Sequence, residues 1–480
     1  MFRRLRMDAR LRDVRKRLAA CFVAAFATIF ALPAQSGIKP IGEQPIAMRA
    51  AEAYYNYFSE HVPGVVEPLI DYSEEELPPL KCDLNAKPKV HAILIGASDS
   101  SEPFGKLAGP NNDVDLLYTS LTSRGAADDD IALMVGEYAN REALAEMFLE
   151  ALGRVNCGDR ALVHFGGNSI RSTDIVGLVP DEVAAPFKEI SVADIWDADF
   201  VNDTHEPTRV MRWAQKAGLY LALNKHTEGV VEIMSARDIS EFVTNLRNRQ
   251  VDVAVTLDTS YASEADIVGL QDKAGGSAMW NLETSGADEE SVDPADYTVP
   301  TPLQPNRGQL AVFYSSIGDS HSIEFSFGEG EDAATYGVFT FRLANVIQNH
   351  DSVTIRAMAE SLKKLPTDEG GAKQRYRVES TDPDLVLFAD ATLSLPQSEP
   401  IVITKPTPKR GAATMEKAEV EIEGSVNWSS PAKAVLVDGK VAELKADNTF
   451  RYTSKLKAGL NTVEVVALTA DGRTHEKRLE

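Results

Sequence analysis

The chain has 480 residues, of which 44% are hydrophobic and 25% are charged. These proportions are typical of globular proteins and exclude a largely disordered chain, while the length exceeds the usual size of one hydrophobic core. The formal net charge of −23 at pH 7 argues against binding to nucleic acid or to an anionic lipid surface.

The first 36 residues have the pattern of a secretory signal. Many basic side chains precede position 18, an apolar stretch covers residues 18–32, and small and polar residues follow it. This stretch is shorter than the roughly 20 residues that a membrane-spanning helix needs. We therefore expect a signal peptide over residues 1–36, export to the periplasm or outside the cell, and no stable membrane anchor after processing. A retained anchor is the alternative.

Two cysteines, Cys82 and Cys157, remain after such processing. An oxidising compartment favours a disulfide between two remaining thiols. Each cysteine also precedes a predicted strand, which would put both at one end of a sheet. We expect this disulfide, with two free thiols as the alternative.

Apolar runs and helical periodicity alternate along most of the chain. After a helical pattern at residues 46–60, we expect strands at 90–96, 131–135, 161–165, 251–257 and 309–315, and helices at 113–124, 141–155, 236–249, 337–349 and 354–364. This alternation predicts an α/β domain with a mostly parallel sheet flanked by helices. Loops at the carboxyl ends of such strands are the usual location of functional sites.

The C-terminal part has a different period. Residues 394–414 are rich in proline and are predicted to be a linker. Short alternating segments follow at 418–422, 434–437, 450–453 and 462–467, separated by turn signals such as Asp438-Gly439. We expect a small all-β sandwich of immunoglobulin-like type over residues 415–480, acting as a spacer or as an adhesive or glycan-binding module.

A series of landmarks resembles, in order and spacing, the caspases, metacaspases and bacterial caspase homologues. The landmarks are residues 91–96, 107–114, 158–159, 177–181, 235–239 and 337–340. The resemblance implies a caspase-like domain over residues 89–393, preceded by an N-terminal helix and linker over residues 37–88.

Both positions of the catalytic dyad are substituted. Members of that family cleave peptides with a cysteine thiolate and a histidine, and by motif these positions correspond to Ser260 and Asn168. A serine hydroxyl needs a general base, and an asparagine amide cannot accept a proton. His164 is expected to be a buried or edge histidine. His321 is the better candidate for a base from elsewhere, and a surface loop histidine is the alternative.

Two aspartates match the metacaspase positions that select Arg or Lys in the substrate. These are Asp113 and Asp258. A carboxylate pair would attract a guanidinium through charge-assisted hydrogen bonds. Alternatively, Asp113 caps the helix that follows it and Asp258 only holds its loop.

The sequence thus predicts an exported caspase-fold pseudoprotease that binds a peptide or protein partner, with a basic side chain in its pocket, and does not cleave it. One alternative is a weakly active endopeptidase or serine hydrolase that uses Ser260. Another is a structural envelope protein. We expect no metal ion, no cofactor and no nucleic acid partner.

Overall fold

The computed structural model describes residues 46–73, 75–83, 85–188, 207, 210, 211, 214, 217–265, 267, 280–283, 307–327, 334–350, 353–362, 374–388, 399–406, 419–457 and 459–479. The predicted signal over 1–36 and much of the predicted linker over 394–414 lie outside these residues. Within them, no helix is both long enough and apolar enough to cross a membrane.

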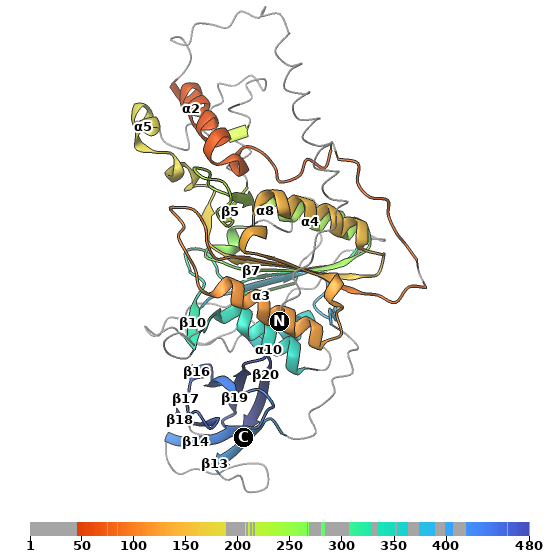
Figure 1. The fold of residues 1–480 in the computed structure, drawn as a ribbon, viewed down its shortest axis with the longest axis vertical. Helices are drawn as coiled ribbons and strands as arrows, with labels where there is room; N and C mark the ends of the chain where they lie inside the picture. The colour runs from red at the N-terminus through yellow and green to blue at the C-terminus, as the bar shows by residue number, and fades with distance from the viewer. Residues whose placement is uncertain are drawn as a thin grey trace, which may run out of the picture.

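A seven-stranded sheet forms the centre of the larger domain (Figure 1). Its order is β2-β1-β3-β7-β9-β12-β8. The strands from β2 to β9 run parallel, β12 pairs antiparallel with β9, and β8 pairs antiparallel with β12. This confirms the predicted α/β class. The strand bounds are β1 Val90–Ala97, β2 Ile131–Val135, β3 Arg160–Gly167, β7 Asp252–Asp258, β8 Trp280–Glu283, β9 Leu310–Tyr314 and β12 Arg377–Ser380.

Helices cover both faces of this sheet. One face packs on α4 and α8, and the other packs on α3 and α10 (Figure 1). Burial on both faces explains why the parallel strands are continuous apolar runs. The helix bounds are α2 Ile46–His61, α3 Gly109–Ser123, α4 Arg141–Arg154, α5 Asp181–Ala184, α8 Ala236–Asn248, α10 Val338–Asn349 and α11 Ile355–Leu362.

Two small sheets accompany the central one. A three-stranded sheet follows β3 in the chain, and a two-stranded hairpin precedes α10. Their strands are β4 Ser169–Arg171, β5 Leu219–Ala222, β6 Ile233–Ser235, β10 Glu324–Phe327 and β11 Ala334–Gly337.

The C-terminal part is a sandwich of two four-stranded antiparallel sheets, ordered β13-β14-β18-β17 and β16-β15-β19-β20. The prediction of a linker throughout 394–414 is wrong at β13, which pairs with β14 and buries Ile401 in the sandwich core. Prolines at positions 400 and 406 flank this strand and do not interrupt it. The bounds are β13 Ile401–Lys405, β14 Glu419–Val426, β15 Ala432–Val437, β16 Lys440–Val441, β17 Glu443–Leu444, β18 Thr449–Lys455, β19 Val463–Thr469 and β20 Thr474–Leu479.

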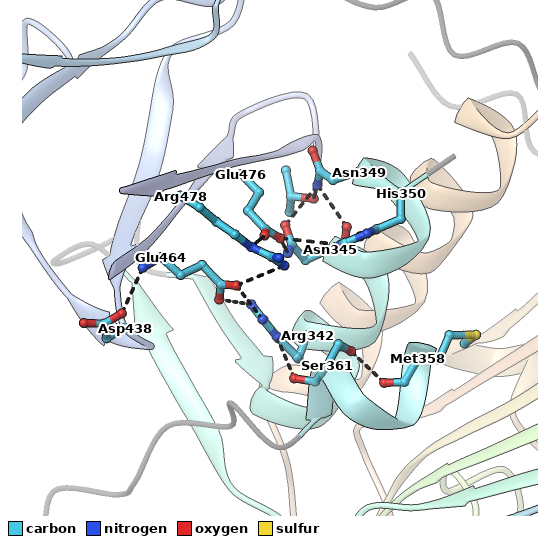
Figure 2. Close-up of polar contacts among 11 residues, drawn as sticks. Arg342, Asn345, Asn349, His350, Met358, Ser361, Asp438, Glu464, Glu476 and Arg478 are labelled. Carbon is cyan, nitrogen blue, oxygen red and sulfur yellow. Dashed lines mark hydrogen bonds and ion pairs between the residues drawn. The ribbon is translucent and has the colours of Figure 1, made fainter. Parts of the chain in front are cut away.

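The sandwich is docked on α10 through a buried polar network (Figure 2). The guanidinium of Arg342 makes two contacts with the carboxylate of Glu464, at 2.5 and 2.9 Å, and both side chains are less than a tenth exposed. One turn further, Asn345 donates to Glu476 at 2.9 Å, and the backbone N–H of Thr474 donates to the Gln348 side chain at 2.9 Å. The two domains therefore share a polar interface and part of one hydrophobic core.

Removing one member of the buried ion pair should loosen this interface. We expect Glu464→Leu to lower the free energy of unfolding by about 3 to 5 kcal/mol because it leaves a buried guanidinium unpaired, whereas Arg342→Met with Glu464→Leu should recover most of the loss. Denaturant unfolding would measure both. Arg451→Met, which breaks an exposed pair with Glu423 in the same sandwich, is the matched control and should cost at most about 1 kcal/mol. Equal losses at both pairs would contradict the prediction.

A disulfide joins Cys82 to Cys157, with the two Cα atoms 4.8 Å apart. Backbone and side-chain bonds surround it: the Cys157 N–H donates to the carbonyl of Lys81, and the Asp83 N–H donates to the side chain of Asn156. The connector before β1 is thereby held against the segment before β3.

We expect the double variant Cys82→Ser, Cys157→Ser to lose about 4 kcal/mol of stability, since the disulfide closes a loop with a sequence separation of 75. Denaturant unfolding without reductant would measure the loss, and thiol counting on the unreduced wild-type protein is the control. Two free thiols in that protein would overturn the prediction.

Candidate functional site

The candidate site lies at the carboxyl ends of three adjacent parallel strands, β3, β7 and β9. Asn168 follows β3, and Ser260 follows β7. We name residues 259–263 the serine loop and residues 315–322, which follow β9, the histidine loop. This edge of the sheet therefore carries Asn168, Ser260 and the histidine loop, one after each of the three strands.

Hydrogen bonds join the serine loop to the histidine loop along its length. Serine side chains and backbone groups both take part. The bonds are Thr259 N to Ser315 Oγ at 3.0 Å, Ala262 N to Ser316 Oγ at 2.8 Å, Ser263 N to Ser316 O at 3.1 Å, Gly318 N to Ser263 Oγ at 3.1 Å and Tyr261 N to Ser320 O at 3.4 Å. The two loops are thus held in one arrangement.

This arrangement brings His321 to Ser260. The Nδ1 atom of His321 lies 3.2 Å from the hydroxyl oxygen of Ser260, and its ring meets the Tyr261 ring edge-on at a centroid distance of 5.5 Å. Arg171 lies over the Tyr261 ring, with its guanidinium carbon 4.8 Å from the ring centroid. The structure therefore pairs the nucleophile position with the histidine that the sequence analysis named as the candidate base from elsewhere.

Asn168 bonds to the backbone of the loop after β1. Its amide donates to the carbonyl of Phe104 at 3.2 Å and to that of Gly105 at 3.5 Å. The next residue, Ser169, donates its hydroxyl to the carbonyl oxygen of Ser260 at 2.5 Å. The two side chains that follow β3 thus hold neighbouring backbone.

His164 is fully buried in β3, as the sequence analysis expects. Its Nδ1 lies 2.8 Å from the hydroxyl of Thr256 on the neighbouring strand β7. Burial lowers the pKa of His164 to about 3, so this ring is neutral at physiological pH. It does not serve the site as a base.

The two aspartates of the predicted pocket meet at the start of α10. Asp113 accepts the Gly337 N–H at 2.9 and 3.1 Å, and Asp258 accepts the N–H and the hydroxyl of Thr340 at 3.2 and 2.6 Å. A Cβ placed on Gly337 would lie 2.3 Å from one oxygen of Asp258, so this contact requires glycine. The alternative in which Asp113 caps its own helix is wrong, because α3 begins earlier, at Gly109.

Burial raises the pKa of both aspartates, and in Asp113 the charge of Asp258 raises it further. The hydrogen bonds from Gly337 and Thr340 oppose these shifts. Asp113 is 2% exposed and Asp258 is 7% exposed, so neither carboxylate is open to a guanidinium from solvent. The pocket for Arg or Lys stays a prediction.

The described residues contain no group of three or more His, Cys, Asp or Glu side chains that could hold a metal ion. The contact of the histidine loop with the serine loop is not among the features expected from the sequence. The serines of the histidine loop, Ser315, Ser316, Ser320 and Ser322, are the local feature of the sequence that points to it.

No family model matches this sequence, and no curated protein matches it. Among solved structures, a Geobacter sulfurreducens protein has 13% identity and a TM-score of 0.36, covering 64% of this chain and 98% of its own. The complex of the pro- and mature domains of RgpB from Porphyromonas gingivalis has 10% identity, a TM-score of 0.25 and coverages of 81% and 68%. A structure described only as a protease has 8% identity, a TM-score of 0.24 and coverages of 82% and 68%. Similarity at this level carries no functional argument.

The Asp113→Asn variant should be more stable than the wild type at neutral pH. A carboxyl whose pKa is raised in the folded state keeps its proton to a higher pH when the protein is folded than when it is unfolded. Its contribution to stability therefore falls as the pH rises above the ordinary pKa range of aspartate. Asparagine keeps an oxygen for the Gly337 N–H and carries no charge. We expect an advantage at pH 7 that shrinks toward pH 5, measured by denaturant unfolding. The exposed Asp129→Asn is the control, and an advantage that is constant with pH would contradict the explanation.

Proposed function

We propose that this chain is an exported caspase-fold pseudoprotease that binds a peptide or protein segment over the serine loop and does not cleave it by the cysteine mechanism. The observation that carries the proposal is the amide of Asn168, which donates to the carbonyls of Phe104 and Gly105. An amide in this position accepts no proton. Ser260 also lacks the low pKa that makes a thiol an effective nucleophile.

The surface around Ser260 offers the groups that bind an extended peptide. Ser260 and Tyr261 are partly exposed, and His321 is exposed. Arg171 lies over the Tyr261 ring and forms ion pairs at 2.7 Å with Asp174 and Asp319, which hold its guanidinium in place. The Tyr261 ring would contact side chains of a partner.

The proposal of export rests on the basic and apolar pattern of residues 1–36 together with the disulfide between Cys82 and Cys157. Disulfides persist in oxidising compartments and are rare in the cytosol. Cell fractionation with the native N-terminus in place would test it, and recovery of the unprocessed chain in the cytosol would reject it.

The purified protein should not turn over fluorogenic peptide amides with Arg, Lys or Asp before the scissile bond, with or without calcium. Losing both members of a nucleophile and base pair leaves only the small acceleration that comes from binding. Product fluorescence over hours would measure this. Turnover that Ser260→Ala abolishes would show that the chain is a peptidase.

Peptide binding is tested separately with an array of randomised peptides probed with the purified protein. We expect bound peptides to lose at least about tenfold in affinity with Tyr261→Ala, since a central aromatic contact is commonly worth more than about 1 kcal/mol. Tyr138→Ala, at an exposed tyrosine after edge strand β2, is the matched control.

Arg peptides and their Gln counterparts should be compared in the wild type and in Asp258→Asn. Equal affinities would restrict the two aspartates to holding α10, and the lack of any bound peptide would favour a structural envelope protein.

A further inference from the structure

Ser260 and His321 form a hydrogen-bonded pair in which the histidine comes from a different strand than in the resembled family. We propose that Ser260 is an acyl-accepting nucleophile with His321 as its general base, and that its substrates are carboxylic esters whose leaving groups depart as stable anions. This inference goes beyond the proposed peptide binding, which does not need a reactive serine.

The distance between the two groups fits proton transfer. His321 Nδ1 lies 3.2 Å from Ser260 Oγ, and a general base acts over a hydrogen bond of roughly 2.6 to 3.2 Å. Ser260 is partly exposed and His321 is exposed, so a small ester reaches the oxygen from solvent. Of the histidines that the structure describes, no other contacts this serine.

The backbone on both sides of His321 is anchored to the segment that carries the serine. On one side, the Ser320 carbonyl accepts the Tyr261 N–H at 3.4 Å. On the other side, the hydroxyl of Ser322 donates to the buried carboxylate of Asp258. An unconstrained surface histidine would need neither bond. Folding therefore already holds the imidazole of His321 beside Ser260, and the reaction does not have to pay this entropic cost again.

The position of the base follows from the order of the strands. In the sheet, β7 lies between β3 and β9, so the loop that carries Ser260 has a neighbour on each side. The β3 side presents Asn168, whose amide is engaged with backbone carbonyls, and the β9 side presents His321. A base on the β9 side replaces the one that is missing on the β3 side.

The reaction balances with these two groups and water. Ser260 Oγ forms a bond to the ester carbonyl carbon as its proton passes to Nδ1 of His321. The carbon–oxygen bond to the leaving group then breaks, the leaving group departs as an anion, and the imidazolium releases its proton to solvent. Water releases the acyl group in a second step, with His321 accepting the water proton and Ser260 regaining one.

The second nitrogen of His321 explains the restriction to activated esters. In a serine protease triad, a carboxylate binds that nitrogen and stabilises the imidazolium. Within the described residues, Nε2 of His321 has no such partner. The pair is therefore suited to leaving groups that depart as stable anions and need little help from a proton.

The test is covalent labelling of the full-length purified protein with diisopropyl fluorophosphate and with p-nitrophenyl acetate. We expect a single adduct on Ser260 by peptide mapping, no adduct in Ser260→Ala, and a rate about 100-fold lower in His321→Gln. His226→Gln, at an exposed histidine outside the site, should react at the wild-type rate. Circular dichroism of each variant verifies its fold.

A second variant keeps the test decisive if His321→Gln does not fold. Ser322→Ala removes the bond to Asp258 but leaves the imidazole, so it should lower the labelling rate below that of the wild type. The proposal is overturned if the folded wild type shows no adduct, if the adduct is on another residue, or if removing the imidazole leaves the rate unchanged. These outcomes do not affect the peptide array, so the two proposals fail independently.

Discussion

The buried carboxylate of Asp258 connects the elements on which the site depends. It ends strand β7, accepts the hydroxyl of Ser322 from the histidine loop, and accepts the N–H and hydroxyl of Thr340 from the first turn of α10. Such burial is tolerated because protein donors replace the lost water and the start of a helix favours negative charge. A single side chain thus sets the relative position of the serine loop, the histidine loop and α10.

Helix α10 links this junction to the C-terminal sandwich. Its first turn contacts Asp258, while Arg342 and Asn345 bind Glu464 and Glu476 of the sandwich (Figure 2). A spacer module is usually joined to its neighbour by a flexible linker alone. This sandwich instead packs apolar side chains and the buried pair of Arg342 and Glu464 against the larger domain. The sandwich is therefore part of the support of the site, because both contact the same helix.

The two proposals are compatible because they concern different sides of strand β7. On the β3 side, the amide of Asn168 donates to the carbonyl of Phe104 and offers no base. On the β9 side, His321 reaches the hydroxyl of Ser260. In a parallel sheet, the loop after a central strand has two neighbours, so a group can approach it from either side.

The sequence by itself determined the class of the fold and the strands β1, β2, β3, β7 and β9. Strands buried on both faces leave continuous apolar runs, and helices leave a period of 3.6, so both can be recognised locally. Only the tertiary structure decided β12, β8 and β13, since short antiparallel strands depend on pairing with distant segments. It likewise decided that Asp113 and Asp258 bind the start of α10, and that His321 reaches Ser260 across 61 positions of the chain. These contacts follow from how separate loops bond to one another at the edge of the sheet, which no local pattern records.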